Sequence, residues 1–485
     1  MYFLATLSVA LAVFSIMRML VPARTIAPIQ NTPAIKEPAP ELLPIQPPPF
    51  PKVDGVYTFR GDFARTGRLP GPVPRRPALK WRYPQQPMCA ESVVGNTKKT
   101  WCGTGWTGQP VVWRRPDGVS EVIFGAFDKR VHFIKLQNGF PSRQPLVVGD
   151  IIKGSATIDP EGEPLLYIGG RDNRLRIVAL DRNRPLVLWT MNANNYPGRW
   201  NDDWDGTPLV QGDFMFVGGE DGIFYAVKLN RDYNVHGLVS VQPEITVRWP
   251  AWNSRLLELV GDGNNSIESS VASYGYRLYF TNSAGRLVGL NQTKLTMGLV
   301  EVVFDFWLGD DADATVAIDE YGMIYAAVEL ERYLPRSEQV GQLLKLNPYS
   351  KEEPVVWSIP VPPGPHDGMG GAWASPAISE STVYFTTNSG LLLAVEREFG
   401  RLLQTEYIGP HAWSSPVLCG STLVVATCNG EIISFAISGD GRLQENWRFQ
   451  IPGQPCIEST PLVWDGHIVV GARDGFIYSL ADLPP

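Results

Sequence analysis

The chain repeats one pattern eight times, and this repetition restricts its fold more than any other feature of the sequence. Each unit begins with a small-residue segment, often containing a proline, and continues into an apolar run of alternating residues. A turn with Gly, Asn or Asp and a second alternating run follow. The turn segments begin at residues 125, 169, 218, 281, 326, 386, 426 and 471. Self-similarity at such spacing is typical of stacked repeat architectures.

The turns and the alternation together predict β-hairpins with two apolar faces. Turn pairs such as DG and SG favour hairpins, because Gly adopts positive φ at no steric cost. In GGEDGIFYAV, Ile223, Tyr225 and Val227 point to one side, and Phe224 and Ala226 to the other. A small sheet that is apolar on both faces must be covered on both, and radial stacking achieves this. We therefore predict an all-β, eight-bladed β-propeller of four-stranded antiparallel blades over residues 57–485.

A tryptophan in the last strand of many units indicates how the ring closes. These tryptophans are Trp189, Trp249, Trp357 and Trp447. The same signature occurs once before the first unit, at Trp81, whereas the last unit stops after its third strand, at Leu480. We therefore predict that Leu79–Tyr83 completes the last blade, because such closure removes an exposed sheet edge.

The repeat resembles that of pyrroloquinoline-quinone (PQQ)-type propellers. The resemblance lies in the string DG-x-[IL]-[FY]-A-[VL], the small-residue-Pro start and the terminal tryptophan. The segments FRGDFARTG (59–67) and LKWR (79–82) are similar to the stretch that often precedes the repeats in this superfamily. The resemblance covers about residues 57–485. Its members include quinoprotein dehydrogenases and non-catalytic BamB-type assembly lipoproteins, so it implies a fold rather than one activity.

The first 56 residues differ in composition from the repeats. Residues 1–17 carry no charge and precede Arg18, so residues 1–21 are predicted to be a cleaved signal peptide or an uncleaved membrane anchor. Residues 22–56 are rich in proline, which prevents helix continuation and sheet pairing, and are predicted to be a disordered linker. We expect an exported protein, in the bacterial periplasm or anchored facing it, with the N-terminus as a membrane tether.

The five cysteines of the chain give information on the cellular compartment in which the protein folds. Cys89 and Cys102 enclose a polar loop, and Cys419 and Cys428 lie on consecutive predicted strands. These two pairs are the disulfide candidates, with Cys456 as a free thiol, and they suit an oxidising compartment. Five reduced cysteines that pack in the core are the alternative.

One position in each unit start, three residues before the proline or its equivalent, is predicted to ring the propeller axis. It is occupied by Thr107, Lys153, Asp205, Glu268, Asp313, Trp373, Trp413 and Glu458. Asp205, Glu268 and Asp313 are candidate Ca²⁺ ligands, because calcium prefers oxygen. Quinoproteins use a comparable arrangement, and the resemblance casts Lys153 as the basic partner of PQQ and Trp373 or Trp413 as its stacking platform. The alternative, which we favour, is that the three carboxylates diverge into a wide wet channel, where solvated charges cost little.

The sequence favours binding over catalysis. It has no GxSxG, Walker, HExxH or dinucleotide fingerprint. The net charge of −7 argues against nucleic acid as a partner. We predict a non-catalytic cell-envelope scaffold or assembly factor, without a cofactor, that binds other envelope proteins through the insertions at 228–265 and 329–354. The alternatives are a PQQ- and calcium-dependent dehydrogenase and a carbohydrate- or small-ligand-binding propeller.

Overall fold

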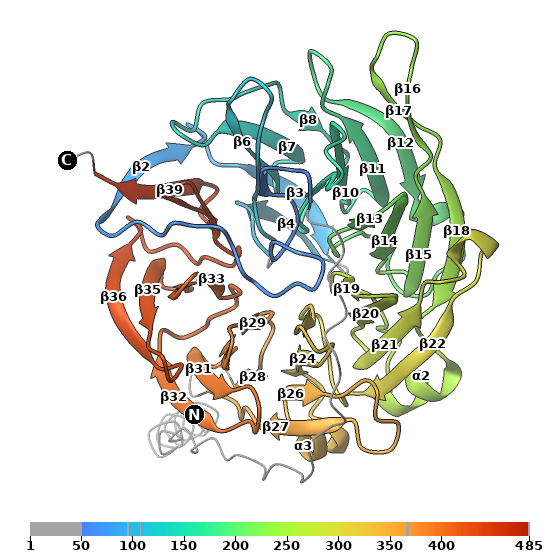
Figure 1. The fold of residues 1–485 in the computed structure, drawn as a ribbon, viewed down its shortest axis with the longest axis vertical. Helices are drawn as coiled ribbons and strands as arrows, with labels where there is room; N and C mark the ends of the chain where they lie inside the picture. The colour runs from blue at the N-terminus through green and yellow to red at the C-terminus, as the bar shows by residue number, and fades with distance from the viewer. Residues whose placement is uncertain (1–50, 95–96, 107, 365–367, 484–485) are drawn as a thin grey trace, which may run out of the picture.

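Eight β-sheets stand around a common axis and form a closed propeller (Figure 1). The computed structural model describes residues 51–94, 97–106, 108–364 and 368–483. The predicted leader (1–21) and most of the predicted linker (22–56) lie outside these residues. Within the described ranges, no helix is long and apolar enough to cross a membrane. The predicted eight-bladed, all-β fold is confirmed.

Each blade is an antiparallel sheet of four strands, and the first blade carries a fifth. In sheet order, the strands of blades one to four are β1 (Gly55–Val56), β5 (Val111–Arg114), β6 (Ser120–Ala126), β7 (Arg130–Lys135) and β8 (Leu146–Val147); β12 (Leu186–Asn192), β11 (Arg174–Ala179), β10 (Leu165–Ile168) and β9 (Thr157–Ile158); β13 (Leu209–Gln211), β14 (Phe214–Gly218), β15 (Ile223–Lys228) and β18 (Glu244–Pro250); β19 (Ala272–Tyr274), β20 (Arg277–Thr281), β21 (Arg286–Asn291) and β22 (Glu301–Trp307). Because β1 pairs with β5, the propeller begins before residue 57 and takes in the end of the predicted linker.

Blades five to eight follow the same plan. Their strands are β23 (Ala317–Ile318), β24 (Ile324–Ala327), β26 (Leu343–Leu346) and β27 (Val355–Ile359); β29 (Ala377–Ile378), β30 (Thr382–Thr386), β31 (Leu391–Glu396) and β32 (Leu402–Tyr407); β33 (Val417–Cys419), β34 (Thr422–Ala426), β35 (Glu431–Ile437) and β36 (Leu443–Gln450); β37 (Leu462–Trp464), β38 (His467–Gly471), β39 (Ile477–Asp482) and β2 (Pro77–Tyr83). The last blade thus takes its outer strand from the N-terminal part of the chain.

Insertions between the blade strands form small additional elements. They are the hairpins β3 (Cys89–Val94) with β4 (Thr97–Cys102) and β16 (Arg231–Tyr233) with β17 (Val239–Val241), the pair β25 (Glu329–Leu330) and β28 (Gly370–Gly371), the helices α2 (Ser254–Val260) and α3 (Pro335–Val340), and the 3₁₀ turns η1 (Ala193–Asn195) and η2 (Leu295–Met297).

The two apolar faces of each blade pack against different neighbours. In β15, Phe224 and Ala226 belong to one buried cluster, whereas Tyr225 and Val227 belong to another. Phe224 stacks on Phe280 of blade four, with ring centroids 5.2 Å apart. The alternation in the sequence therefore serves two interfaces at once, as expected of a sheet that is covered on both sides.

Ring closure occurs as predicted. In the β2–β39 pair, Leu79 lies opposite Leu480 and Trp81 opposite Ser479. The indole Nε1 of Trp81 donates a hydrogen bond to the carbonyl oxygen of Leu136 in blade one, at 2.7 Å. The closing strand therefore joins the last blade to the first through both its backbone and its tryptophan.

The terminal tryptophan performs the same task elsewhere in the ring. In blade five, Trp357 Nε1 donates to the carbonyl oxygen of Arg397 in blade six, at 3.0 Å. A Cβ on Gly400, where φ is +70°, would lie only 2.5 Å from Trp357 Cγ, so the indole requires glycine beneath it. The repeated tryptophan of the sequence is therefore a contact between neighbouring blades.

Residues 57–71, which we call the N-terminal plug, close one end of the channel. Their carbonyl oxygens accept backbone hydrogen bonds from the inner strands of six blades. The pairs are Tyr57 with Ile158, Phe63 with Ser273, Ala64 with Ile318, Thr66 with Ile378, Gly67 with Leu418 and Gly71 with Asp465. Two fully buried guanidinium groups, those of Arg60 and Arg65, donate to further carbonyl groups of the blades and the plug. The plug thus contacts the propeller almost all the way round.

A belt of hydroxyl groups above the plug connects the inner strands. At five junctions, a backbone N–H of one blade donates to the Ser or Thr hydroxyl of the next, at 2.7–3.0 Å. The hydroxyls are those of Ser155, Ser270, Thr315, Ser375 and Ser415. The small residues at the unit starts therefore satisfy backbone donors that the close approach of the blades would otherwise bury without partners.

Candidate functional site

Two sets of side chains meet at the axis, on the side of the hydroxyl belt opposite the plug. One set is the ring predicted from the unit starts. The other set comes from the turns between the second and third strands of the blades. In these turns, the backbone N–H of one residue donates to the carbonyl oxygen of the residue that stands two positions before the ring residue of the same blade. Glu220 donates in this way to Asp203 at 3.0 Å, and Glu329 to Asp311 at 2.8 Å. This repeated bond places each turn side chain next to its ring residue.

The first acidic trio consists of Asp205, Glu220 and Glu268, whose carboxylate oxygens lie within 4.8 Å of one another. The buried ammonium of Lys153 donates to Asp205 Oδ2 and, at 3.2 Å, to Glu220 Oε1. It also lies 4.8 Å from the ring centroid of Trp106. Lys153 is therefore an internal counter-ion for this trio.

The electrostatics of the first trio follow from burial and from Lys153. Burial alone would lower the pKa of Lys153, but the charges of Asp205 and Glu220 outweigh it, so this pKa lies well above its ordinary value. Burial, together with the charges of Asp313 and Glu220, raises the pKa of Glu268 to about 8. Burial also raises the pKa of Asp205 well above its usual range. The negative charge of this trio is therefore offset in two ways: by the ammonium of Lys153, and by protonation of carboxyl groups whose pKa is raised.

The second acidic trio consists of Asp311, Asp313 and Glu329, again with carboxylate oxygens within 4.8 Å of one another. Ser283 Oγ donates to Asp313 Oδ1 at 2.8 Å, and Asn388 Nδ2 donates to Glu329 Oε2 at 3.1 Å. No lysine stands among these three groups in the described structure. Burial raises the pKa of all three carboxyls well above the usual range, and their mutual repulsion adds to the shift.

An aromatic row crosses the channel beside the two trios. Trp106 and Trp373 meet edge to face with centroids 5.1 Å apart, and Trp373 meets Trp413 in the same manner at 5.8 Å. His411 stacks on Trp413 at 4.6 Å. Trp106 has φ of +60°, which is unusual for a residue with a side chain, and its N–H donates to Glu458 Oε2 at 3.2 Å. Trp106 and Trp373 line the same small cavity as Asp205, Glu268 and Asp313.

The expectation of a wide wet channel is wrong. Asp205 and Glu268 converge rather than diverge, and Asp313 joins a second convergent cluster. The space between Phe59 of the plug, Trp106 and Trp373 is a cavity of about 20 Å³. That volume holds about one water-sized occupant. The plug and the tryptophans fill the axis; the repeat pattern indicated Trp373 and Trp413 but gave no sign of the plug.

The axis does not fit PQQ. A flat organic cofactor needs a pocket of several hundred Å³, whereas the cavity here holds about 20 Å³ and Trp373 packs edge to face with both Trp106 and Trp413. Lys153, the predicted partner of the quinone, is bound to carboxylates of the first trio. The carboxylate clusters do have the donor chemistry that a calcium ion requires.

Two disulfides are present, and one of them corrects the sequence analysis. Cys89 and Cys102 are joined at the base of the β3–β4 hairpin. The expected Cys419–Cys428 pair is wrong: Cys428 is joined to Cys456, and Cys419 is a buried free thiol. Cys419 and Cys428 lie at opposite ends of β34, a strand of five residues that spans roughly 17 Å.

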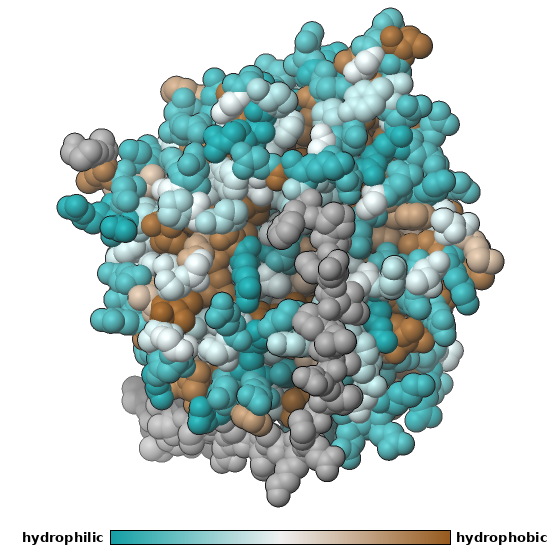
Figure 2. Space-filling model, viewed as in Figure 1, coloured by the Kyte–Doolittle hydropathy of each residue, from teal (hydrophilic) through white to brown (hydrophobic). Residues whose placement is uncertain are grey.

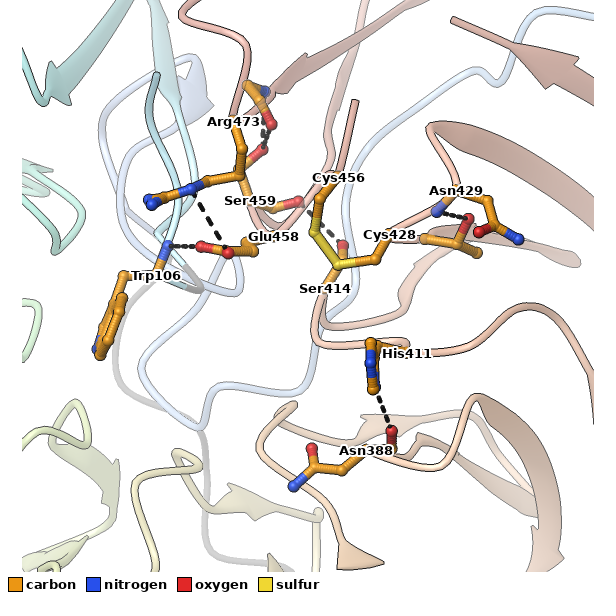
Figure 3. The surroundings of a disulfide bond; sticks show 12 residues. Trp106, Asn388, His411, Ser414, Cys428, Asn429, Cys456, Glu458, Ser459 and Arg473 are labelled. Carbon is orange, nitrogen blue, oxygen red and sulfur yellow. Dashed lines mark hydrogen bonds and ion pairs between the residues drawn. A yellow bond between two sulfur atoms is a disulfide. The ribbon is translucent and has the colours of Figure 1, made fainter. Parts of the chain in front are cut away.

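The Cys428–Cys456 disulfide joins blade seven to blade eight close to the axis. Figure 3 shows it beside Glu458, whose carboxylate points toward Trp106 and Arg473. His411 lies on the other side of the disulfide and contacts the carbonyl oxygen of Asn388 at 2.9 Å. The disulfide therefore links two neighbouring blades of the propeller close to His411, at one end of the aromatic row.

Several axial residues were absent from the sequence prediction. Glu220 and Glu329 lie in segments that the analysis treated only as hairpin turns, and Trp106 precedes the first ring position. The signal was nevertheless present. The turn residues that make the same bond as Glu220 in other blades are Arg171, Ser283, Glu329, Asn388, Cys428 and Arg473; in blade one Phe127 takes this place, but its N–H donates to Gly103. These turn residues are as polar, taken together, as the residues at the eight ring positions. A hairpin turn in solvent does not require such a set, so their polarity could have indicated a second group of axial side chains.

Comparison with known proteins supports the fold. No family model matches the chain, and no curated protein matches it by sequence. The quinohemoprotein alcohol dehydrogenase from Comamonas testosteroni is similar in structure, with a TM-score of 0.58 and 13% identity over 89% of this chain and 82% of that one. A quinohemoprotein alcohol dehydrogenase from Pseudomonas putida HK5 has a TM-score of 0.58 and 10% identity, over 88% and 80% of the two chains.

A more distant match is BamB from Moraxella catarrhalis, with a TM-score of 0.38 and 10% identity over 84% of this chain and 98% of that one. The resemblance inferred from the repeat is thus confirmed: the chain has the eight-bladed propeller architecture of the quinoproteins. At these identities the likeness establishes the fold, and function rests on the residues of this chain.

Proposed function

We propose that this protein is a non-catalytic, exported propeller that binds another cell-envelope protein, and that the β16–β17 hairpin is its main contact. The hairpin projects beyond the ring (Figure 1). Its turn carries Val235, whose side chain is 96% exposed, next to the half-exposed Tyr233. Apolar atoms are visible at the end of this projection (Figure 2). The projection of this hairpin beyond the ring, with an exposed valine at its tip, is the observation on which the proposal rests.

The hairpin is held rigidly at its base. Arg231 Nη1 lies 2.7 Å from both carboxylate oxygens of Asp159 in blade two. Arg182 Nη2 donates to the carbonyl oxygen of Val239 at 2.7 Å. At the tip, Asn234 Oδ1 accepts from the backbone N–H of His236 at 2.9 Å. A contact that is ordered before binding loses little conformational entropy when the partner arrives, which favours affinity.

Two further features support the proposal that the protein is non-catalytic and exported. The axial cavity of about 20 Å³ leaves no room for a substrate beside a cofactor. Disulfides such as Cys89–Cys102 and Cys428–Cys456 persist mainly in oxidising compartments such as the bacterial periplasm. Both observations agree with a scaffold or assembly factor of the envelope.

Site-specific photo-crosslinking in living cells tests this function. A photoreactive benzoylphenylalanine in place of Val235 should yield one discrete adduct with an envelope protein. The same residue in place of Met297, which is also exposed but lies in η2 of blade four, is the matched control and should not yield that adduct. Val235→Asp should prevent co-purification of the partner and leave the melting temperature unchanged. Equal crosslinking at both positions, or none at Val235, would contradict the proposal.

A groove between blades six and seven favours small-ligand binding as a second candidate. It encloses about 440 Å³ and is lined by polar groups that include Arg68, Ser379 and Glu380. Its volume lies within the range of small-molecule pockets. A glycan array with the wild-type protein and with Glu380→Gln tests this candidate. Binding of a defined oligosaccharide by the wild type alone would support it, and no binding by either would reject it.

A further inference from the structure

The groove between blades six and seven is assembled from three parts of the chain that lie far apart in the sequence. Blade six supplies residues 379–381, in the turn between β29 and β30. Blade seven supplies residues 420–421, between β33 and β34, and residues 437–439, at the end of β35. The plug supplies Arg68. At about 440 Å³ the groove has the volume of a small-molecule pocket, whereas the axial cavity of about 20 Å³ does not.

Arg68 is held at its backbone and at one nitrogen of its guanidinium group. Its backbone forms a parallel bridge with Leu418 in the first strand of blade seven. Its Nε donates to the carbonyl oxygen of Ile378 in blade six at 2.9 Å. Its two Nη atoms have no hydrogen-bond or ion-pair partner among the described residues. The guanidinium is therefore fixed in position, and two of its nitrogens remain available to a ligand in the groove.

Glu380 gives the groove a negative charge that is not paired with Arg68. Its side chain is exposed and forms no hydrogen bond or ion pair with another residue in the described ranges. Glu320 also interacts electrostatically with Arg68, but its carboxylate is bound by Arg397 Nη2 at 2.9 Å. The groove therefore offers one cation and one anion at separate places, which suits a ligand with an anionic group and additional neutral donors.

The free nitrogens of Arg68 indicate which anionic group fits. Two N–H groups of a guanidinium match the two oxygens of a carboxylate. A phosphate group matches the same nitrogens, but it carries up to two negative charges, and Glu380 in the same groove would repel the second. The pair of charges therefore favours a carboxylate.

The remaining lining is rich in hydroxyl groups and poor in apolar surface. Ser379 and Ser438 donate to backbone carbonyl oxygens at 2.9 Å, whereas the exposed Ser421 has no side-chain partner in the described structure. Leu418 and Ile437 are the aliphatic side chains among the lining residues, and none of these residues is aromatic. An aromatic or aliphatic ligand would therefore find few contacts, whereas a ligand with several hydroxyl groups would find hydrogen-bond partners.

We propose that this groove binds an acidic oligosaccharide: the Nη atoms of Arg68 hold a uronate carboxylate, and sugar hydroxyl groups bond to Glu380 and Ser421. The inference rests on the small-ligand candidate proposed above and specifies the class of ligand and the group that recognises its charge. Hydrogen bonds between charged groups are about twice as strong as neutral ones. Arg68 therefore determines the preference for acidic over neutral saccharides.

Matched pairs of saccharides test the role of Arg68. The probes are trimers of galacturonate, mannuronate and glucuronate, each compared with the trimer whose carboxylates are reduced to alcohols, in isothermal titrations of the full-length protein. At least one uronate trimer should bind the wild type at least about tenfold more tightly than its reduced form. Arg68→Gln should weaken binding of that uronate by at least about tenfold and leave binding of the reduced form within about twofold. Arg75→Gln changes an exposed arginine outside the groove and is the matched control, with both affinities unchanged.

Gly439→Trp tests the location of the site without altering Arg68. A Cβ on Gly439 would meet no atom within 4 Å, so a larger side chain can occupy the groove without straining the fold. This variant should lose uronate binding and keep its melting temperature.

Three outcomes would overturn the inference and leave saccharide binding as a candidate function. They are equal affinities for every uronate trimer and its reduced form, unchanged uronate affinity in Arg68→Gln, and uronate binding that survives Gly439→Trp. Absence of binding of every trimer by the wild type would also overturn it, and the glycan array then decides separately whether the small-ligand candidate stands.

Discussion

Arg60 Nη1 lies 2.6 Å from the carbonyl oxygen of Pro416, although 356 residues separate the two along the chain. Its Nη2 lies 2.6 Å from the carbonyl oxygen of Pro376. One fully buried guanidinium thus binds the unit starts of blades six and seven, and its own backbone N–H donates to Gln109 Oε1 in blade one at 2.7 Å. The plug is therefore part of the core of the propeller.

Arg60→Met should lower the free energy of unfolding by about 3 kcal/mol, because it leaves two buried carbonyl groups without donors. Urea unfolding followed by tryptophan fluorescence measures the loss. Arg75→Met is the control: this side chain is exposed, and the expected change is within about 0.5 kcal/mol. Equal stability of the two variants would show that the plug is dispensable.

Truncation should separate the leader from the propeller. Removal of residues 1–50 should leave the melting temperature unchanged, because every described blade strand, from β1 (Gly55–Val56) onward, is retained. Removal of residues 1–83 should prevent stable folding, because it deletes the plug and β2 and exposes the edge of β39. Circular dichroism melting curves of the two truncated proteins are the measurement, and a cooperative melt of the shorter one would refute the expected role of closure.

The disulfide assignment can be tested by mass mapping and by substitution. Peptides released without reduction should link Cys428 to Cys456, and alkylation of the native protein should spare Cys419, since burial raises the pKa of its thiol to about 12. Cys456→Ala should cost about 3 kcal/mol, because the bond closes a long loop in the unfolded chain. Cys419→Ala removes no crosslink and should cost clearly less.

Asp221 should make stability depend on pH. Burial, assisted by Asp202, raises its pKa from 3.8 to about 6, against the opposing hydrogen bond from Tyr225 and the charge of Arg248. The folded state therefore binds the proton more tightly than the unfolded state. Its stabilising contribution is complete below about pH 4 and is lost as the pH rises through about 6. In urea unfolding across this range, Asp221→Asn should show a flatter pH profile than the wild type, and identical profiles would contradict the assignment.

The blades could be predicted from the sequence because their determinants are local. Alternating apolar residues, glycine turns and, in many units, a terminal tryptophan specify the sheets, and Trp81 revealed the closing strand by standing outside the repeat. The plug could not be predicted in this way. It binds the blades mainly through its own backbone carbonyls, such as those of Phe63 and Gly67, and backbone groups leave no pattern in side chains.

Only part of the axial site could be predicted from the sequence. Lys153, Asp205, Glu268 and Asp313 were placed at the axis because they occupy one position of the repeat. Their convergence was not expected, because the turn residues that complete both trios belong to a second group of axial side chains and the plug that narrows the channel is non-local. The Cys419–Cys428 error has a similar origin, since neighbours in sequence stood at opposite ends of a strand.

The plug and β2 also impose an order on biosynthesis. The ribosome makes residues 57–83 before the other strands of the blades, whereas their partners in blades seven and eight, such as Leu418 and Leu480, follow the other six blades. The N-terminal segment must therefore wait, unpaired, until the whole chain has been made or translocated. Contacts of such large sequence separation slow folding, and the open ring exposes sheet edges in the meantime. Maturation of this protein should consequently depend on chaperones that shield an almost complete but unlocked ring.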